Sequence, residues 1–92
     1  MQDSDFEKDE AERIEDAIHD LLSQRKAGGT ICPSEVARRL YPQEEWRSKM
    51  TRVREVAFAM VESGRIEITQ GGKVVDARNT KGAIRLRRHF PV

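Results

Sequence analysis

Residues 63–88 read SGRIEITQGGKVVDARNTKGAIRLRR, and this stretch decides the fold. Ser63-Gly64 ends a helical pattern, and two stretches of alternating apolar and polar residues follow it, at 65–70 and 83–88. Alternation of this kind places successive side chains on opposite faces of a strand. The glycine- and charge-rich segment 71–82 separates the two stretches. The pattern predicts an antiparallel β-hairpin that directly follows a helix.

Each predicted strand has an apolar face and a polar face. The apolar face consists of Ile66, Ile68, Ile84 and Leu86. The polar face consists of Glu67, Thr69, Arg85 and Arg87. We therefore expect a half-buried hairpin whose apolar face packs against the helices. A second arrangement stays open, because Gly71-Gly72 suits a two-residue turn that would pair residues 73–75 with the preceding strand in a three-stranded meander.

The N-terminal segment has the spacing of an amphipathic helix. Six apolar residues recur at helical intervals between positions 11 and 22,. Residues 4–7, SDFE, fit a capping box in which Ser4 and Glu7 satisfy free backbone N–H groups,. Gly28-Gly29 provides a stop. We therefore predict a first helix over residues 5–26.

Two further helices are predicted between the first helix and the hairpin. One covers residues 33–41, since Pro33 suits the first helical position and Pro42 ends the helix. The other covers residues 44–63, where five apolar residues form one continuous face. These five are Trp46, Met50, Val53, Ala57 and Met60. A brief strand is expected at residues 30–32, ahead of both helices.

The predicted order is therefore helix, strand, helix, helix, strand, strand. This order is typical of a winged helix-turn-helix, an α+β fold in which two helices joined by a short turn precede a β-hairpin, the wing. Residues 41–43 would form the turn and residues 71–82 the wing tip. The 92 residues suit a single domain,. We expect residues 1–4 and 89–92 to be flexible ends.

Composition and motifs argue against several classes of protein. No apolar run approaches the roughly 20 residues needed to cross a bilayer, and the acidic N-terminus does not resemble a secretory signal. The single cysteine, Cys32, can form no internal disulfide, so we expect a cytoplasmic protein,. His19 and His89 lie far apart, and no catalytic triad or phosphate loop stands out. We therefore expect no enzyme, no metal, no cofactor and no membrane partner.

Charge is distributed unevenly along the chain. Residues 1–20 hold nine acids and two bases, a net charge of −7, whereas residues 21–92 hold fifteen bases and seven acids, a net charge of +8. This asymmetry favours a polyanionic partner for the basic part. Two solvated faces that attract each other within one domain would give the same counts. A sharper hypothesis is that residues 1–12 fold over the basic surface and compete with nucleic acid.

The predicted fold places basic and hydroxyl side chains where winged helices contact nucleic acid, so we expect a partner such as duplex DNA. The candidates are Arg38 and Arg39 on the second helix, Arg47, Ser48, Thr51 and Arg52 on the third, and Lys73, Arg78, Asn79 and Lys81 on the wing. Arginine can contact guanine through two hydrogen bonds, and all these residue types can contact phosphates. Glu55, on the exposed side of the third helix, would repel phosphate.

The alternative function is a protein-interaction or regulatory module that binds no nucleic acid, with a second copy of the chain or another protein as partner. Phe58 would belong to an exposed contact in that case, or it would be buried against the first helix. Trp46 is expected in the core rather than as a stacking platform for a base. Cys32 is expected as a buried apolar side chain rather than a redox switch.

Six stretches of the chain carry one further signal. They are ICPSEVARRL at 31–40, WR at 46–47, VREVA at 53–57, GRIEITQ at 64–70, VD at 75–76 and KGAIRL at 81–86. Together they resemble a family of small bacterial proteins known mainly as a domain of unknown function. The resemblance covers residues 10–88 and implies a winged-helix-like fold with no assigned chemistry. Proline is expected next to Gly82 in such sequences, whereas this chain has Ala83.

Overall fold

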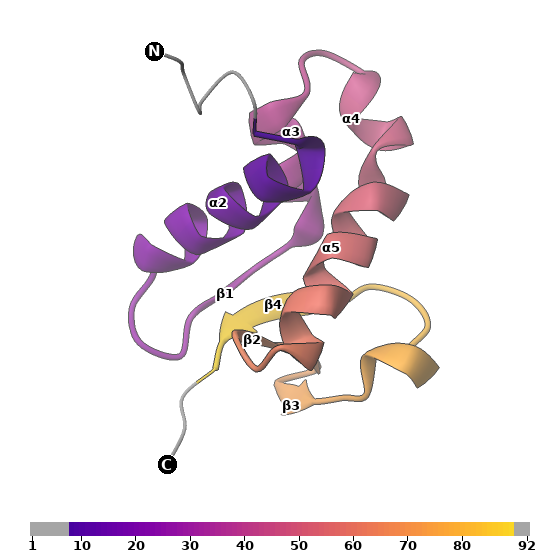
Figure 1. Ribbon diagram of the computed structural model, residues 1–92. Helices are drawn as coiled ribbons and strands as arrows, with labels where there is room; N and C mark the ends of the chain where they lie inside the picture. Colours follow the sequence, from indigo (N-terminus) through magenta and orange to yellow (C-terminus); the bar gives the residue numbers. More distant parts are fainter. Residues whose placement is uncertain (1–7, 90–92) are drawn as a thin grey trace.

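The computed structural model describes residues 8–89, which form an α+β fold of four α-helices and a four-stranded antiparallel sheet (Figure 1). The helices are α2 (Glu10–Ser23), α3 (Pro33–Leu40), α4 (Glu45–Ser48) and α5 (Met50–Glu62). The strands are β1 (Thr30–Ile31), β2 (Ile66–Gln70), β3 (Lys73–Val74) and β4 (Arg85–Arg88), with a short 3-10 helix, η1 (Ala77–Asn79), between β3 and β4. The predicted α+β class is confirmed, and the arrangement is compatible with a winged helix-turn-helix.

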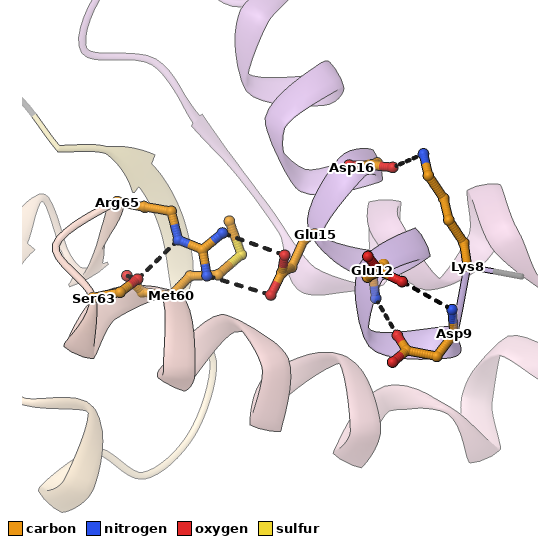
Figure 2. A network of polar contacts seen from close by, with 8 residues as sticks. All are labelled: Lys8, Asp9, Glu12, Glu15, Asp16, Met60, Ser63 and Arg65. Atoms are coloured by element: carbon orange, nitrogen blue, oxygen red, sulfur yellow. Dashed lines mark hydrogen bonds and ion pairs between the residues drawn. The ribbon is translucent and has the colours of Figure 1, made fainter. Parts of the chain in front are cut away.

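Helix α2 is shorter than the apolar pattern predicts. Asp9 caps it: the Glu12 N–H donates to the Asp9 carboxylate at 2.8 Å, and the Asp9 N–H donates to the Glu12 carboxylate at 3.2 Å (Figure 2). This reciprocal capping box sets the first helical residue at Glu10 instead of residue 5,. The helix ends at Ser23, three residues before the predicted boundary. The capping box predicted within residues 4–7 lies outside the described residues.

The third predicted helix is two helices, which corrects the expectation of one continuous helix. Lys49, with φ −98° and ψ −2°, separates α4 from α5. Its N–H donates to the carbonyl of Trp46, three residues back, at 3.0 Å, and the Val53 N–H then donates to the Lys49 carbonyl at 3.0 Å. Because the backbone angles of Lys49 stay near the right-handed helical region, the apolar positions on both sides remain nearly in phase. The spacing of apolar residues therefore conceals the break.

Strand β4 lies inside the sheet, whose order is β1-β4-β2-β3. Leu86 of β4 lies opposite Ile31 of β1 on one side and opposite Ile68 of β2 on the other. In Figure 1 the sheet lies below α2, α3 and α4, and the segment that contains η1 lies to its right. The predicted hairpin pair is thus present as β2 and β4, although β4 begins at Arg85 instead of residue 83.

The turn between β2 and β3 confirms the arrangement that the sequence left open. Gly71 and Gly72 have φ values of 57° and 83°, and they join Gln70 to its partner Lys73. Two successive positive φ values are accessible to glycine with little strain and match the twist of a two-residue hairpin. Strand β3 therefore extends the predicted hairpin, and β1 adds a fourth strand at the other edge.

One apolar core lies between the helices and the sheet. All four residues of the predicted apolar strand face belong to it: Ile66, Ile68, Ile84 and Leu86. Thr69 was expected on the polar face, but it is buried, with 1% exposure. It lies opposite Val74 of β3 and Arg85 of β4, so neighbouring strands flank it on both sides. Thr69 therefore lies on the predicted face of the sheet, beside Arg85, but it is buried where alternation predicts exposure to solvent.

Acids of α2 pair with bases from the later part of the chain. Both terminal nitrogens of Arg65 donate to the Glu15 carboxylate, each at 3.3 Å, which joins α2 to the segment before β2 (Figure 2). Asp20 forms an ion pair with Arg39 of α3. Glu10 pairs with Arg52 at 3.3 Å. Part of the charge asymmetry of the sequence is therefore neutralised by ion pairs within the domain, as expected for two faces that attract each other.

The ends that the sequence predicts to be flexible lie almost entirely outside the described residues. His89 is the exception. Its Nδ1 lies 3.1 Å from the Glu67 carboxylate, and its N–H donates to the Arg65 carbonyl at 3.4 Å. Glu67 also accepts a hydrogen bond from Arg87 at 2.7 Å, so these three side chains form one cluster on the exposed side of the sheet. Within residues 8–89, no helix has the length and apolar character required to span a membrane.

Candidate nucleic-acid interface

Trp46 brings together two predicted binding residues from different helices. The guanidinium carbon of Arg38, in the last turn of α3, lies 4.4 Å from the centroid of the Trp46 ring. That of Arg47, on α4, lies 4.6 Å from it. Both arginines are exposed, while Trp46 is half-buried and packs against the core, as the sequence predicts. Because cation–π contacts attract both guanidinium groups to the same ring, this arginine–tryptophan cluster holds two positive charges close together.

Hydroxyl side chains accompany the cluster. Ser48 is the last residue of α4, and Thr51 lies in the first turn of α5; both are exposed. The Ser48 hydroxyl donates to the Glu45 carbonyl at 2.9 Å, which leaves its oxygen able to accept,. Arg47 also pairs with Glu44 at 2.8 Å, but this pair is 67% and 81% exposed, so its stabilising effect is small and a stronger anion can replace it,.

Arg52 is surrounded by acids, unlike Arg47. Its Nε donates to Glu10 at 3.3 Å, and its Nη1 donates to Glu55 at 3.3 Å. The ammonium of Lys49 lies 3.6 Å from Glu10, and the Tyr41 hydroxyl donates to the same carboxylate. We refer to Glu10, Tyr41, Lys49 and Arg52 as the Glu10 cluster. Sequence reasoning missed the role of Glu10, because 42 residues separate it from Arg52 and no local pattern joins them.

Electrostatic coupling within the Glu10 cluster shifts two pKa values in opposite directions. The hydrogen bond from Tyr41, together with the charges of Lys49 and Arg52, holds the pKa of the Glu10 carboxyl below its ordinary value, although partial burial opposes this. Burial first, and then the hydrogen bond and charge of Glu10, raise the pKa of Tyr41 to about 12. At neutral pH the carboxylate is therefore ionised and the phenol keeps its proton.

The phenol of Tyr41 is expected to titrate at a pKa of about 12 instead of the ordinary 10.0. Tyr41 is the only tyrosine in the chain, so ultraviolet absorbance of the tyrosinate follows it alone. Because the pKa is raised by folding, its contribution to stability is complete below about pH 10 and is lost as the pH rises towards about 12. The free energy of unfolding should fall over that interval.

The control for this titration is Glu10→Gln, which removes the carboxylate charge that opposes ionisation of the phenol. The pKa of Tyr41 should then decrease, though not fully to its ordinary value, because burial remains. If the titration curves of Glu10→Gln and the natural sequence coincide, Glu10 does not contact Tyr41 in solution.

Arg39 does not join the arginine–tryptophan cluster. Successive residues on a helix point about 100° apart, and Arg39 pairs with Asp20 of α2 while Arg38 lies over Trp46. Arg39 lines a shallow groove of about 480 Å³ between α2 and α3, together with Leu40 and four charged residues of the N-terminal segment. These four are Lys8, Arg13, Asp16 and Asp20. The groove carries both signs of charge and so offers no strong preference for an anion.

The wing is tied to α5 by one side chain that the sequence did not single out. Arg54 Nη2 donates to the Gly82 carbonyl at 3.3 Å, which holds the loop after η1 beside α5 (Figure 1). Arg78 donates to Glu62 of α5 at 2.8 Å. The hydrogen bond and charge of Glu62 raise the pKa of Arg78, so this guanidinium keeps its positive charge. The wing therefore folds towards the helix that the sequence predicts to contact nucleic acid.

Asp76 orders the wing tip. Its carboxylate accepts hydrogen bonds from the Arg78 N–H at 2.9 Å and from the Asn79 side-chain amide at 3.2 Å. Lys73 and Lys81 are exposed at the two ends of the same segment. Asn79 thus supports the loop through its side chain, whereas the two lysines extend the basic surface of the wing.

All ten predicted residues are exposed. Five of them contact a nearby acidic side chain: Arg39, Arg47, Arg52, Arg78 and Asn79. The other five lie near the turn between α3 and α5 or along the wing: Arg38, Ser48, Thr51, Lys73 and Lys81. Glu55 and Glu62 both lie on α5 and each bind one of these arginines. The basic surface is thus interrupted along α5.

Two other sequence candidates have well-defined surroundings. Cys32 is half-buried before α3 and accepts a hydrogen bond from the Ser34 hydroxyl at 3.1 Å. Phe58 is half-buried and lines a hollow of about 200 Å³ with Val61, Val75 and three charged residues. The charged residues are Glu62, Asp76 and Arg78. Within the described range 8–89, no group of three or more His, Cys, Asp or Glu side chains could hold a metal ion.

Comparison with known protein families gives a match over most of the chain. Residues 11–89 match the model of a family described as "Protein of unknown function (DUF3253)". The match covers most of the 92 residues and includes every helix and strand described above except the first residue of α2. A comparison with curated proteins found no match. The resemblance to a domain of unknown function that the sequence motifs indicated is confirmed.

Proposed function

The chain belongs to the DUF3253 family, and we propose that it binds duplex DNA through α3, α4 and the start of α5, with the wing on the DNA backbone. The observation that carries this proposal is the arginine–tryptophan cluster, in which Arg38 and Arg47 lie over the ring of Trp46. An α+β arrangement compatible with a winged helix-turn-helix supports it. The proposal implies a compartment that contains DNA, which we expect to be the cytoplasm.

The arginine–tryptophan cluster suits a phosphate for two reasons. The guanidinium group is planar and matches two phosphate oxygens with two N–H donors. Its contact with Trp46 orders a long side chain before the ligand arrives, which reduces the conformational entropy lost on binding. Arg38 and Arg47 come from the two helices that flank the turn, so one phosphate or two neighbouring phosphates can contact both.

In this proposal the residues next to the arginine–tryptophan cluster contact base edges, and the wing makes a second contact, to the DNA backbone. Ser48 and Thr51 lie where the start of a recognition helix reads the major groove, and hydroxyl groups can donate to or accept from bases and phosphates. Lys73 and Lys81 supply point charges on the wing. Arg54 keeps the wing near α5 through the Gly82 carbonyl, so that both contacts can form on one duplex.

A protein-interaction module is the alternative, and one observation favours it. Half of the residues that line the hollow beside Phe58 are apolar, namely Phe58, Val61 and Val75. A partner that inserts an apolar side chain there would gain from burial. In that case binding would depend on Phe58 and would respond little to changes at Arg38 and Arg47.

Fluorescence of Trp46 should report DNA binding directly, since it is the only tryptophan in the chain. A phosphate that contacts Arg38 and Arg47 alters the environment of the ring, so titration with a mixed-sequence duplex at low salt should change the emission. The logarithm of the affinity should fall with the logarithm of salt concentration with a slope of about −1.8 or steeper, because each phosphate contact contributes about −0.9. Absence of binding to any duplex at low salt would refute the proposed function.

A further inference from the structure

We propose that Glu10 is an autoinhibitory contact: it occupies Arg52 and Lys49 at the start of α5, and a DNA phosphate must displace it to bind there. The inference rests on the proposed DNA-binding function and concerns the regulation of the same surface. It replaces the broader hypothesis that residues 1–12 cover the basic surface, because it assigns the competition to one carboxylate in the described part of the chain.

The geometry of the Glu10 cluster matches the geometry that a phosphate would need. One carboxylate oxygen of Glu10 lies 3.3 Å from Arg52 Nε, and the other lies 3.6 Å from Lys49 Nζ. A phosphate also presents two oxygens to neighbouring cationic groups. The side chains of Glu10, Lys49 and Arg52 are 32%, 33% and 43% exposed, so an incoming phosphate can reach them.

Glu10 is held in place from both sides. It is the first residue of α2, directly after Asp9, whose capping box fixes the start of the helix. The Tyr41 hydroxyl, from the segment between α3 and α4, donates to its carboxylate. Lys49 lies 5.1 Å from the centroid of the Tyr41 ring, so the phenol orients both partners of the ion pair. An anchored carboxylate competes better than a mobile surface acid, because less conformational entropy is lost in the contact.

The side-chain charges of the Glu10 cluster and the neighbouring Glu55 sum to zero. Glu10 and Glu55 supply two negative charges, and Lys49 and Arg52 supply two positive charges. This part of α5 therefore offers no net attraction for DNA, although it begins next to the arginine–tryptophan cluster. Loss of the Glu10 charge alone would leave a net charge of +1 among the remaining three side chains. DNA affinity is therefore expected to be set partly by an acid on the opposite helix, α2.

Replacement of Glu10 by glutamine in the full chain tests the inference. Glutamine keeps an oxygen that can accept from Tyr41 but has no charge. Affinity for a mixed-sequence duplex at low salt should rise about 5- to 10-fold, and the salt slope should become steeper by about 1 to 2, because Arg52 and Lys49 then contact phosphates. Arg52→Gln added to Glu10→Gln should remove most of the gain.

The matched control is Glu15→Gln on the same helix. Glu15 also pairs with one arginine across elements, but its partner Arg65 lies before β2. Glu15→Gln removes the same charge and the same type of ion pair as Glu10→Gln does. Because this ion pair lies before β2 and not at the start of α5, DNA affinity should change less than about twofold. If the natural sequence binds DNA and Glu10→Gln binds DNA no more tightly than Glu15→Gln does, the Glu10 inference is overturned and the proposed function stands. If no variant binds DNA at low salt, the proposed function itself is overturned.

A purely structural role for Glu10 predicts a different pair of changes. Glu10→Gln would then lower the melting temperature and would leave DNA affinity unchanged or reduce it. Thermal unfolding of Glu10→Gln and Glu15→Gln in parallel measures the structural part. Tighter DNA binding by Glu10→Gln despite a lower melting temperature supports autoinhibition, and a parallel loss of both properties contradicts it.

Discussion

Replacing Arg38 and Arg47 together by glutamine is expected to weaken binding to duplex DNA by roughly 30- to 1,000-fold. This corresponds to about 1 to 2 kcal/mol for each arginine that contacts DNA. The salt slope should become shallower by about 1.8, since two counterions are no longer displaced by these side chains. The physical reason is that both guanidinium groups are already ordered over Trp46, at 4.4 and 4.6 Å from the ring centroid.

The matched control for this variant is Arg25→Gln with Lys26→Gln. Both residues are exposed after the end of α2, outside the helix-turn-helix and the wing, and their replacement removes the same two charges. A change of less than about threefold is expected, because exposed charges that do not contact the DNA act weakly once salt screens them. If both double variants lose affinity equally, net charge and not the arginine–tryptophan cluster governs binding. If neither loses affinity, the alternative site beside Phe58 becomes the better explanation.

Leu86→Ala is expected to lower the free energy of unfolding by about 3 to 5 kcal/mol, and the melting temperature by roughly 15 to 30 °C. Leu86 has 0% exposure, and it lies opposite both Ile31 and Ile68 in the strand that joins the two halves of the sheet. Truncation therefore leaves a cavity that two strands and the helices surround. Small domains have a total stability of only about 5 to 15 kcal/mol, so this single change approaches complete unfolding.

Val74→Ala is the control for the strand order. Val74 is 55% exposed on the edge strand β3, so its truncation should change the free energy of unfolding by less than about 0.5 kcal/mol,. Thermal and denaturant unfolding followed by circular dichroism would compare the two variants. Similar stabilities for Leu86→Ala and Val74→Ala would contradict the placement of β4 inside the sheet.

The helix–hairpin unit at residues 63–88 could be predicted because its signals are local. The period-two alternation at Ile66, Ile68, Ile84 and Leu86 gives the buried face directly, and all four are buried. Gly71-Gly72 indicated a two-residue turn, because glycine can adopt the backbone angles that such a turn requires. Thr69 lies on the predicted face, opposite Arg85, but it is buried, and alternation within β2 does not reveal that burial.

Helix boundaries were less predictable than helix identity. Asp9 and the earlier Ser4 both precede a glutamate by three residues, so two capping boxes compete on sequence alone,. The structure uses Asp9 and Glu12. Likewise the break at Lys49 leaves the apolar spacing intact, and it becomes visible only in the backbone hydrogen bonds.

The amino-acid sequence by itself determined the α+β class, the apolar faces and the set of basic residues available for an anionic partner. These properties follow from spacing and side-chain type over a few residues. Only the tertiary structure decided which of these charges are available to an anionic partner and which are paired within the domain. Packing of α2 against α3 and α5 places Glu10 beside Arg52, and the turn between α3 and α4 places Trp46 under Arg38 and Arg47. Coulomb interactions and cation–π contacts depend on distance in space, and spacing along the chain does not report that distance.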